Sequence, residues 1–286
     1  MSTTIYYFSG SGNSLFVAKE LQQRIPDSDL IPMASLLSQE KIVTGTEVIG
    51  LVFPVHCTTL PVPVRQFLTR LEFTTAPYLF AVVTQGGAWP RLLEFHLETI
   101  LKAKGVNLDA FFTIKMPWAS PVGLMPVYIP GFIEYPKPEE KIAQMGSDAL
   151  KKLDVIQDVI LARDCTPADD FPRAIDLSFK HVVCKLMEPA TSGLETTTID
   201  FYADEDCTGC GICEEVCTSQ KIKMVDGTPL WQDEVQCYFC YACFSFCPVQ
   251  SILVRNIYTK KGERYFHPGI TSAEIASQKD NGIPKL

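Results

Sequence analysis

Residues 207–217 of the chain read CTGCGICEEVC, and residues 237–247 read CYFCYACFSFC. The two stretches pair cysteine with cysteine at a shift of 30 residues, and Ile222 falls opposite Ile252, so the repeat continues into the apolar residues that follow. Each half has the spacing C-x2-C-x2-C-x3-C. This internal duplication uses eight of the eleven cysteines, and it predicts two similar sites that organise the C-terminal part of the chain.

The spacing indicates iron–sulfur clusters. Three thiolates two residues apart curl the backbone around one cluster, and in runs of this spacing the fourth cysteine ligates the other cluster. The alternative is a pair of zinc sites. However, zinc sites rarely have a third cysteine only two residues after a C-x2-C pair, and they usually separate their cysteine pairs by a longer loop. The sequence therefore predicts one [4Fe-4S] cluster held by Cys207, Cys210, Cys213 and Cys247, and a second held by Cys237, Cys240, Cys243 and Cys217.

The repeat resembles the bacterial two-cluster ferredoxins, most closely in its second half, where Pro248 follows Cys247 as in the C-P ending of that family. In the first half Thr218 stands in place of that proline. The departure leaves the ligands intact and can alter the hydrogen bonding and potential of one cluster. Aromatic residues interleave with the second run, where we expect them to exclude water from the clusters: Tyr238, Phe239, Tyr241, Phe244 and Phe246.

The first 115 residues alternate short apolar runs with amphipathic stretches. The runs are rich in β-branched or aromatic residues, and they predict strands over Thr4–Phe8, Glu47–Val55, Pro77–Thr84 and Leu108–Ile114. Recurrence of Leu, Phe and Ile every three or four residues predicts helices over Leu15–Arg24, Val62–Leu71 and Pro90–Lys104. Such alternation predicts an α/β fold, a parallel sheet covered by helices on both faces.

The middle of the chain has a different sequence pattern. Residues 116–136 are rich in proline, which argues against regular structure. An apolar stripe from Ile142 to Ile160 predicts a long helix after Pro138, and a second stripe predicts a helix over 173–187, with a linker over 190–198. Beyond Pro268 the chain is polar, and we expect a loose end anchored by Ile270 and Ile275.

A loop of small polar residues follows the first predicted strand: Ser9, Gly10, Ser11, Gly12, Asn13 and Ser14. Small residues let backbone N–H groups converge on a phosphate at the N-terminus of the next helix, and the hydroxyls and Asn13 can donate further hydrogen bonds. A Walker loop would need a lysine, and the dinucleotide fingerprint fails because residue 15 is Leu. The alternative to a phosphate site is an ordinary glycine-rich turn.

The loop resembles the flavodoxin phosphate loop, [ST]-x-[ST]-G-x-[ST], through Ser9, Ser11, Gly12 and Ser14. That resemblance implies a flavodoxin-like doubly wound sheet that binds FMN at the carboxyl ends of its strands. In that fold the loops after the third and fourth strands contact the flavin, and here these loops follow the predicted strands Glu47–Val55 and Pro77–Thr84. The resemblance therefore also implies flavin contacts from Pro54, Val55, His56, Thr84, Gly86, Gly87 and Trp89. Trp118 is a further candidate for covering a ring face, and ordinary packing is the alternative for both tryptophans.

The whole chain resembles proteins in which a flavodoxin-like domain is fused to a C-terminal dicluster ferredoxin. We therefore divide it into a flavodoxin-like FMN-binding domain (1–165), a helical connector (166–198), a small α+β ferredoxin domain (199–257) and a C-terminal extension (258–286). Related proteins often carry a Met-Pro-x-Asn-Tyr segment after the fifth strand. Here Met116 and Pro117 are followed by Trp118, Ala119 and Ser120, so the Asn-Tyr pair is absent.

Composition and charge restrict the classes of partner and the cellular location that we expect. The net charge is −8, and no Lys/Arg run marks a nucleic-acid surface. Residues 200–257 hold nine acids and three bases, a balance of 3 − 9 = −6, so the ferredoxin domain is either a docking surface for a basic redox partner or a solvated acidic face. The sequence shows neither a secretory signal nor a membrane span, so we expect a cytoplasmic protein, where the thiols stay reduced.

Clusters transfer one electron at a time and a flavin takes one or two, so the combination predicts electron transfer. We expect single electrons to pass between two [4Fe-4S] clusters and FMN, linking a low-potential donor to a protein acceptor. One rival is an FMN-dependent reductase of a small oxidant, such as a quinone or nitro compound, fed through its own ferredoxin domain. The other is an interaction module in which the clusters only brace the fold.

Overall fold

The computed structural model describes residues 2–56, 59–86, 91–121, 138–165, 199–255, 259, 261–262 and 264–279. Five strands form a parallel sheet in the order β2-β1-β4-β6-β7. This is the flavodoxin-like strand order 2-1-3-4-5, and it confirms the predicted fold. The strands are β1 (Thr3–Tyr7), β2 (Ser28–Pro32), β4 (Val48–Pro54), β6 (Tyr78–Gln85) and β7 (Ala110–Lys115).

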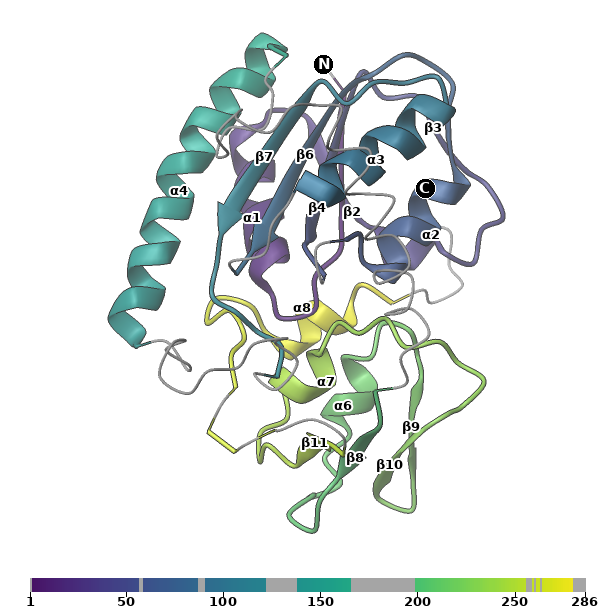
Figure 1. Ribbon diagram of the computed structural model, residues 1–286, viewed down its shortest axis with the longest axis vertical. Helices are drawn as coiled ribbons and strands as arrows, with labels where there is room; N and C mark the ends of the chain where they lie inside the picture. Colours follow the sequence, from purple (N-terminus) through teal and green to yellow (C-terminus); the bar gives the residue numbers. More distant parts are fainter. Residues whose placement is uncertain are drawn as a thin grey trace.

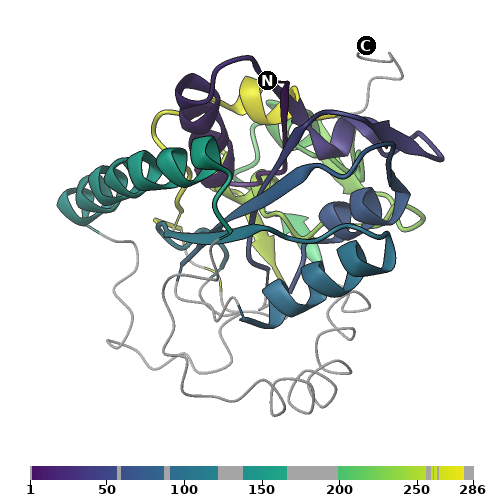
Figure 2. The ribbon, with the colours of Figure 1, turned by 90° about the horizontal axis from the view of Figure 1, so that it is seen from above.

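Helices cover both faces of this sheet (Figure 2). Helices α1 (Asn13–Arg24) and α4 (Glu139–Ala162) bury their apolar residues against one face, and α2 (Val62–Arg70) and α3 (Arg91–Ala103) against the other. Successive residues of β4 alternate between the two cores, as Val48 and Ile49 do. Both faces of the strand are thus apolar, which is why it is a continuous apolar run in the sequence.

The long helix α4 confirms the predicted stripe in its second half. Ala149, Leu153, Ile156 and Ile160 are buried against α1 and the sheet, whereas Ile142 and Met145 are half-buried. The helix therefore closes one side of the sheet (Figure 1). The helix predicted over 173–187, the linker over 190–198 and part of the proline-rich stretch lie outside the described residues.

Four short elements of the N-terminal part were not predicted. The edge strand β2 is half-polar and only five residues long, so it has no strong apolar pattern. A 3-10 helix, η1 (Met33–Leu36), follows it, and β3 (Ile42–Thr44) pairs in parallel with β5 (Leu71–Phe73) in a separate two-stranded sheet. Strands of three residues are too short to show a period of two.

The cysteine-rich unit, residues 199–255, lies at the lower end of the molecule in Figure 1. It has a small core of its own, which includes Phe201, Ile222, Phe244 and Ile252. It is built from two antiparallel two-stranded sheets and two short helices. The sheets pair β8 (Phe201–Ala203) with β11 (Ile252–Val254) and β9 (Ile222–Val225) with β10 (Thr228–Trp231), and the helices are α6 (Ile212–Glu215) and α7 (Ala242–Ser245). This arrangement confirms a small α+β unit after the α/β domain.

The C-terminal segment, residues 264–279, returns to the N-terminal sheet and carries helix α8 (Ser272–Ala276). Ile270 and Ile275 are buried in the core that α1 and α4 form, as expected. Tyr265 and His267, which precede Pro268, are buried as well, and so is Gln278, an anchor beyond Pro268 that the sequence interpretation did not include. No helix among those described has both the length and the apolar character needed to cross a bilayer.

Candidate functional site

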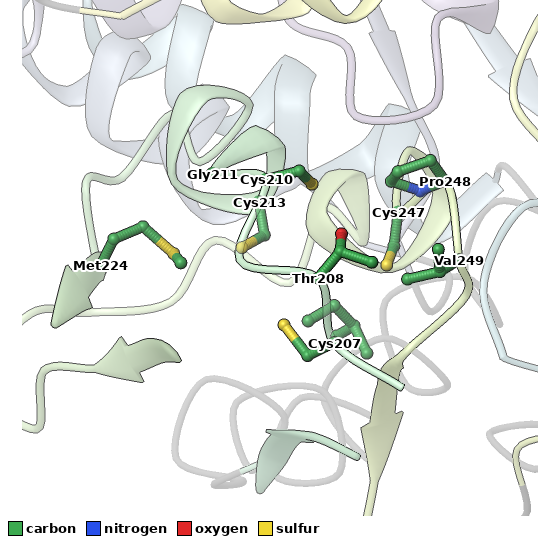
Figure 3. A pocket seen from close by; sticks show the side chains of 10 residues that line it. Cys207, Thr208, Cys210, Gly211, Cys213, Met224, Cys247, Pro248 and Val249 are labelled. Carbon is green, nitrogen blue, oxygen red and sulfur yellow. The ribbon is translucent and has the colours of Figure 1, made fainter. Parts of the chain in front are cut away.

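Two small cavities in the cysteine-rich unit collect the eight cysteines of the repeat. The first is lined by Cys207, Cys210, Cys213 and Cys247, together with Thr208, Met224 and Pro248 (Figure 3). The second is lined by Cys217, Cys237, Cys240 and Cys243, together with Lys221, Trp231 and Tyr238. Each cavity thus draws three cysteines from one run and the fourth from the other, which is the crosswise grouping that the sequence predicts.

The backbone repeats with the same shift of 30 residues as the cysteines. Gly209 and Gly211 have positive φ in the first run, and Phe239 and Tyr241 have positive φ at the equivalent positions of the second. A left-handed conformation is costly for a non-glycine residue, so its presence at two bulky aromatics indicates a loop shape that the site requires. Backbone N–H groups point back to the thiols in these loops, as Phe239 donates to Cys237 Sγ (3.4 Å) and Ser251 donates to Cys247 Sγ (3.2 Å).

Burial governs the chemistry of the thiols. It raises the pKa of Cys213 and of Cys237 to about 11, and that of Cys240 to about 12, and neighbouring cysteines add to the increase. Burial also raises the pKa of Cys243 well above its usual value. These thiols stay protonated at neutral pH unless a cation binds beside them, so binding of iron would release protons. By contrast, Cys210 is exposed, which puts the first cavity nearer to solvent.

The glycine-serine loop, residues 9–14, lies between β1 and the N-terminus of α1. Ser9 Oγ accepts a hydrogen bond from Gly12 N (3.1 Å), and Ser14 Oγ bonds to Thr84 Oγ1 (2.7 Å) at the end of β6. Gly12 has a φ of 95°, which favours glycine. Among the described residues, the backbone amides of Gly10 and Ser11 have no hydrogen-bond partner. With the free first-turn amides of α1, they form the donor set that an anion needs.

Asn13, predicted as a phosphate ligand, also has a structural role. Its side-chain amide donates to the carbonyl of Pro117 (3.0 Å), and its oxygen accepts from the hydroxyl of Tyr265 (2.9 Å). Both ends of the side chain therefore tie the glycine-serine loop to other segments. This contact joins the loop to the residues after β7 and to the C-terminal segment.

The residues predicted to face a flavin ring come together where β4 and β6 end. Pro54 pairs in register with Thr84, and Val55 N donates to the Thr84 carbonyl (2.9 Å). The His56 ring lies edge-on to Phe8, with centroids 6.3 Å apart, and burial lowers the pKa of His56 to about 4, so it is neutral at pH 7. Trp118 packs on Gly86, where an added Cβ would come within 3.1 Å of the indole. Gly87 and Trp89 lie outside the described residues.

The second cysteine run packs directly on this edge of the sheet. Gly10 meets the backbone of Cys240 so closely that a Cβ there would overlap the Cys240 carbonyl oxygen. Tyr238 lies edge-on to Phe8 with ring centroids 6.4 Å apart. The contact extends to both sides, through Gln66 to Gln236 (3.0 Å) and through Ser245 to the Ala119 carbonyl (3.3 Å). The second cavity is therefore the one beside the glycine-serine loop.

The C-terminal segment covers the same loop from another side. Gln278 accepts from Ser9 N (2.9 Å) and donates to Ser9 O (2.9 Å), and His267 N donates to Ser11 O (2.8 Å). Ile270 and His267 pack on Gly12. The sequence interpretation missed these residues. One signal for α8 was available, because Thr271 and Glu274 form a capping box, the T-x-x-E pattern that marks a helix start.

We expect Gln278→Ala to destabilise the protein by about 1–3 kcal/mol for each Ser9 backbone group left buried without a partner. Gln278 is 0% exposed, so water cannot replace the lost hydrogen bonds without repacking. Anaerobic urea unfolding followed by circular dichroism measures the change. Gln23→Ala, at an exposed position of α1, is the matched control and is expected to leave stability within about 0.5 kcal/mol. Equal stability of the two variants would contradict the expectation.

Some of the acidic side chains on the surface of the cysteine-rich unit form ion pairs with lysines. Lys261 forms ion pairs with Asp204 (2.7 Å) and with Asp206, and Lys223 pairs with Glu214 (3.3 Å). Lys279 also donates to the Glu214 carbonyl (2.7 Å). These contacts reduce the local charge that would attract a basic partner, so docking at this surface stays a prediction.

The comparisons with known proteins agree with the division of the chain into an α/β domain and a C-terminal cysteine-rich unit. Residues 206–252 match the family described as 4Fe-4S dicluster domain (Fer4_9). No curated protein matches the sequence.

Solved structures match the α/β part weakly. A putative flavoprotein from Bacteroides uniformis is 18% identical, with 41% of this chain and 92% of that chain covered, at a TM-score of 0.32. A flavoprotein in complex with FMN from Lactobacillus acidophilus is 16% identical, with 39% and 92% covered, at 0.30. At these scores the fold assignment rests on the strand order. The chain thus joins an α/β domain of flavodoxin-like fold to a C-terminal 4Fe-4S dicluster domain.

Proposed function

We propose that this protein transfers single electrons between two [4Fe-4S] clusters and a bound FMN, and so links a low-potential donor to a protein acceptor. The observation that carries the proposal is the contact between Gly10 and Cys240. It brings the second set of cysteines against the loop that resembles a flavin phosphate site. Such clusters exchange one electron each and a flavin exchanges one or two, so neighbouring sites of these two kinds suit conversion between single electrons and pairs.

The cysteines fit the clusters. In each cavity four thiols surround a space, and backbone N–H groups from the cysteine loops point to sulfur. Thiols spread around a space suit a cube with iron at its corners better than a single zinc ion, which needs four ligands about one point. We therefore assign Cys207, Cys210, Cys213 and Cys247 to the first cluster and Cys217, Cys237, Cys240 and Cys243 to the second.

The glycine-serine loop fits a phosphate. It is a turn of small residues before a helix of twelve residues, and the amides of Gly10 and Ser11 have no partner among the described residues. We assign the loop to the FMN phosphate and the ends of β4 and β6 to the ring. The neutral imidazole of His56 and the indole of Trp118 offer apolar surface there without adding charge.

The two cavities differ in their surroundings, which supports an order of use. The first includes the exposed Cys210, and the second packs on the sheet edge. We propose that an external partner exchanges electrons at the first cavity and that the second cavity serves the flavin.

Anaerobic purification with iron, sulfide and flavin quantified tests the proposal. We expect about eight iron, about eight sulfide and one FMN per chain. Clusters without any flavin after heat extraction would contradict the FMN assignment, and two zinc ions instead of iron would contradict the cluster assignment. Rapid turnover of a quinone or nitro compound without a protein partner would favour the reductase instead of the carrier.

A further inference from the structure

Residue 218 occupies a special position in the repeat. It follows the fourth cysteine of the first run, as Pro248 follows the fourth cysteine of the second, again at a shift of 30 residues. Pro248 lines the first cavity and has no hydrogen-bond donor. At the equivalent position beside the second set of cysteines, the chain has Thr218 and therefore a hydroxyl.

The Thr218 hydroxyl is buried without a partner. The residue is only 4% exposed, and its Oγ1 makes no hydrogen bond among the described residues. Leaving a buried hydroxyl without a partner is unfavourable, so an acceptor is expected at this site. Thr218 directly follows Cys217, which lines the second cavity, just as Pro248 follows Cys247 beside the first. Its buried hydroxyl therefore lies next to the second set of cysteines in the chain.

We propose that Thr218 donates a hydrogen bond to sulfur of the second cluster and makes that cluster easier to reduce. This inference rests on the proposed function, since it needs two clusters. Reduction adds negative charge that spreads over the sulfurs, so a hydrogen-bond donor stabilises the reduced form more than the oxidised form. Hydrogen bonds to sulfur are one of the controls on the potential of such clusters.

The position gives the hydrogen bond a functional consequence. Cys240 is the cysteine whose backbone packs on Gly10 in the glycine-serine loop. A donor at Thr218 therefore tunes the cluster next to the flavin, whereas Pro248 leaves the first cluster without an equivalent donor. The difference at this one repeat position therefore contributes to a difference in potential between the two sites.

An anaerobic redox titration followed by electron paramagnetic resonance tests the inference. In the unsubstituted protein, two cluster midpoints are expected. Thr218→Val keeps the shape and removes the hydroxyl, and we expect one midpoint to become more negative by roughly 59 mV, a tenfold change in the ratio of reduced to oxidised cluster. Thr218→Ser keeps the hydroxyl and is expected to stay near the unsubstituted value. Thr218→Pro, which copies Pro248 and also lacks a donor, is expected to shift the same midpoint in the same direction.

Thr228→Val is the matched control, because Thr228 is exposed on β10 of the same unit and lines neither cavity. We expect both of its midpoints to stay unchanged. The inference is overturned if Thr218→Val and Thr218→Pro retain both midpoints with full iron content, or if both midpoints move together. An unsubstituted protein without two clusters by iron count would overturn the proposed function itself, and the inference with it.

Discussion

Cys217→Ala is expected to remove the second cluster, about four of the roughly eight irons, and to leave the first cluster intact. Cys217 lies in the first run of the sequence, but in the structure it lines the cavity of Cys237, Cys240 and Cys243. A cluster that loses one of its four thiolates loses its ligand set. Iron analysis and the electron paramagnetic resonance spectrum of the remaining cluster measure the result.

Three companion variants decide between crosswise and local ligation. If the grouping is crosswise, Cys217→Ala retains the same cluster signal as Cys237→Ala, and Cys247→Ala retains the same signal as Cys207→Ala. A match between Cys217→Ala and Cys207→Ala would show local ligation and contradict the assignment. Cys165→Ala is the control, because Cys165 is exposed and lies outside both cavities, so its iron content should not change.

Gly10→Ala is expected to separate the cysteine-rich unit from the glycine-serine loop. An added Cβ would overlap the Cys240 carbonyl oxygen and come within 2.9 Å of Cys240 Cβ, and the obstacle is backbone that cannot rotate away. Inserting a carbon into a packed contact costs about 1–3 kcal/mol. We expect lower stability in anaerobic urea unfolding, loss of flavin, and slower reduction of any flavin that remains when the clusters are reduced first.

Gly146→Ala is the matched control for Gly10→Ala. Gly146 lies in α4, and an added Cβ there meets nothing within 4 Å. Alanine is the better helix former, so this change is expected to stabilise the protein by about 0.5–1 kcal/mol. Gly10→Ala with unchanged stability and flavin content would show that the close contact with Cys240 is not needed.

The main elements of the α/β domain could be predicted because their causes are local. The strands at Val48 and Tyr78 are continuous apolar runs, since both faces of each strand are covered, and the α4 stripe reflects a period of 3.6 residues. The elements that were missed have no such pattern. The strand at Ser28 is half-polar because it lies at the edge of the sheet, and a three-residue strand is too short for any period.

In the candidate sites too, features with a local cause could be predicted and features without one could not. The cysteine spacing indicates cluster chemistry, because the backbone must curl around each cluster within a few residues. The glycine-serine loop indicates an anion site for the same local reason. The second role of Asn13, which ties its loop to Pro117 and Tyr265, could not be predicted, because its partners are 104 and 252 residues away along the chain.

By itself, then, the sequence determined the parallel α/β domain, the two cysteine sets and the candidate phosphate loop, all of which follow from spacing over a few residues. Only the tertiary structure decided that Cys240 packs on Gly10 and that Gln278 is buried against Ser9. Those contacts join residues more than 200 positions apart, and they depend on shape complementarity between folded surfaces, which leaves no periodic pattern in the chain.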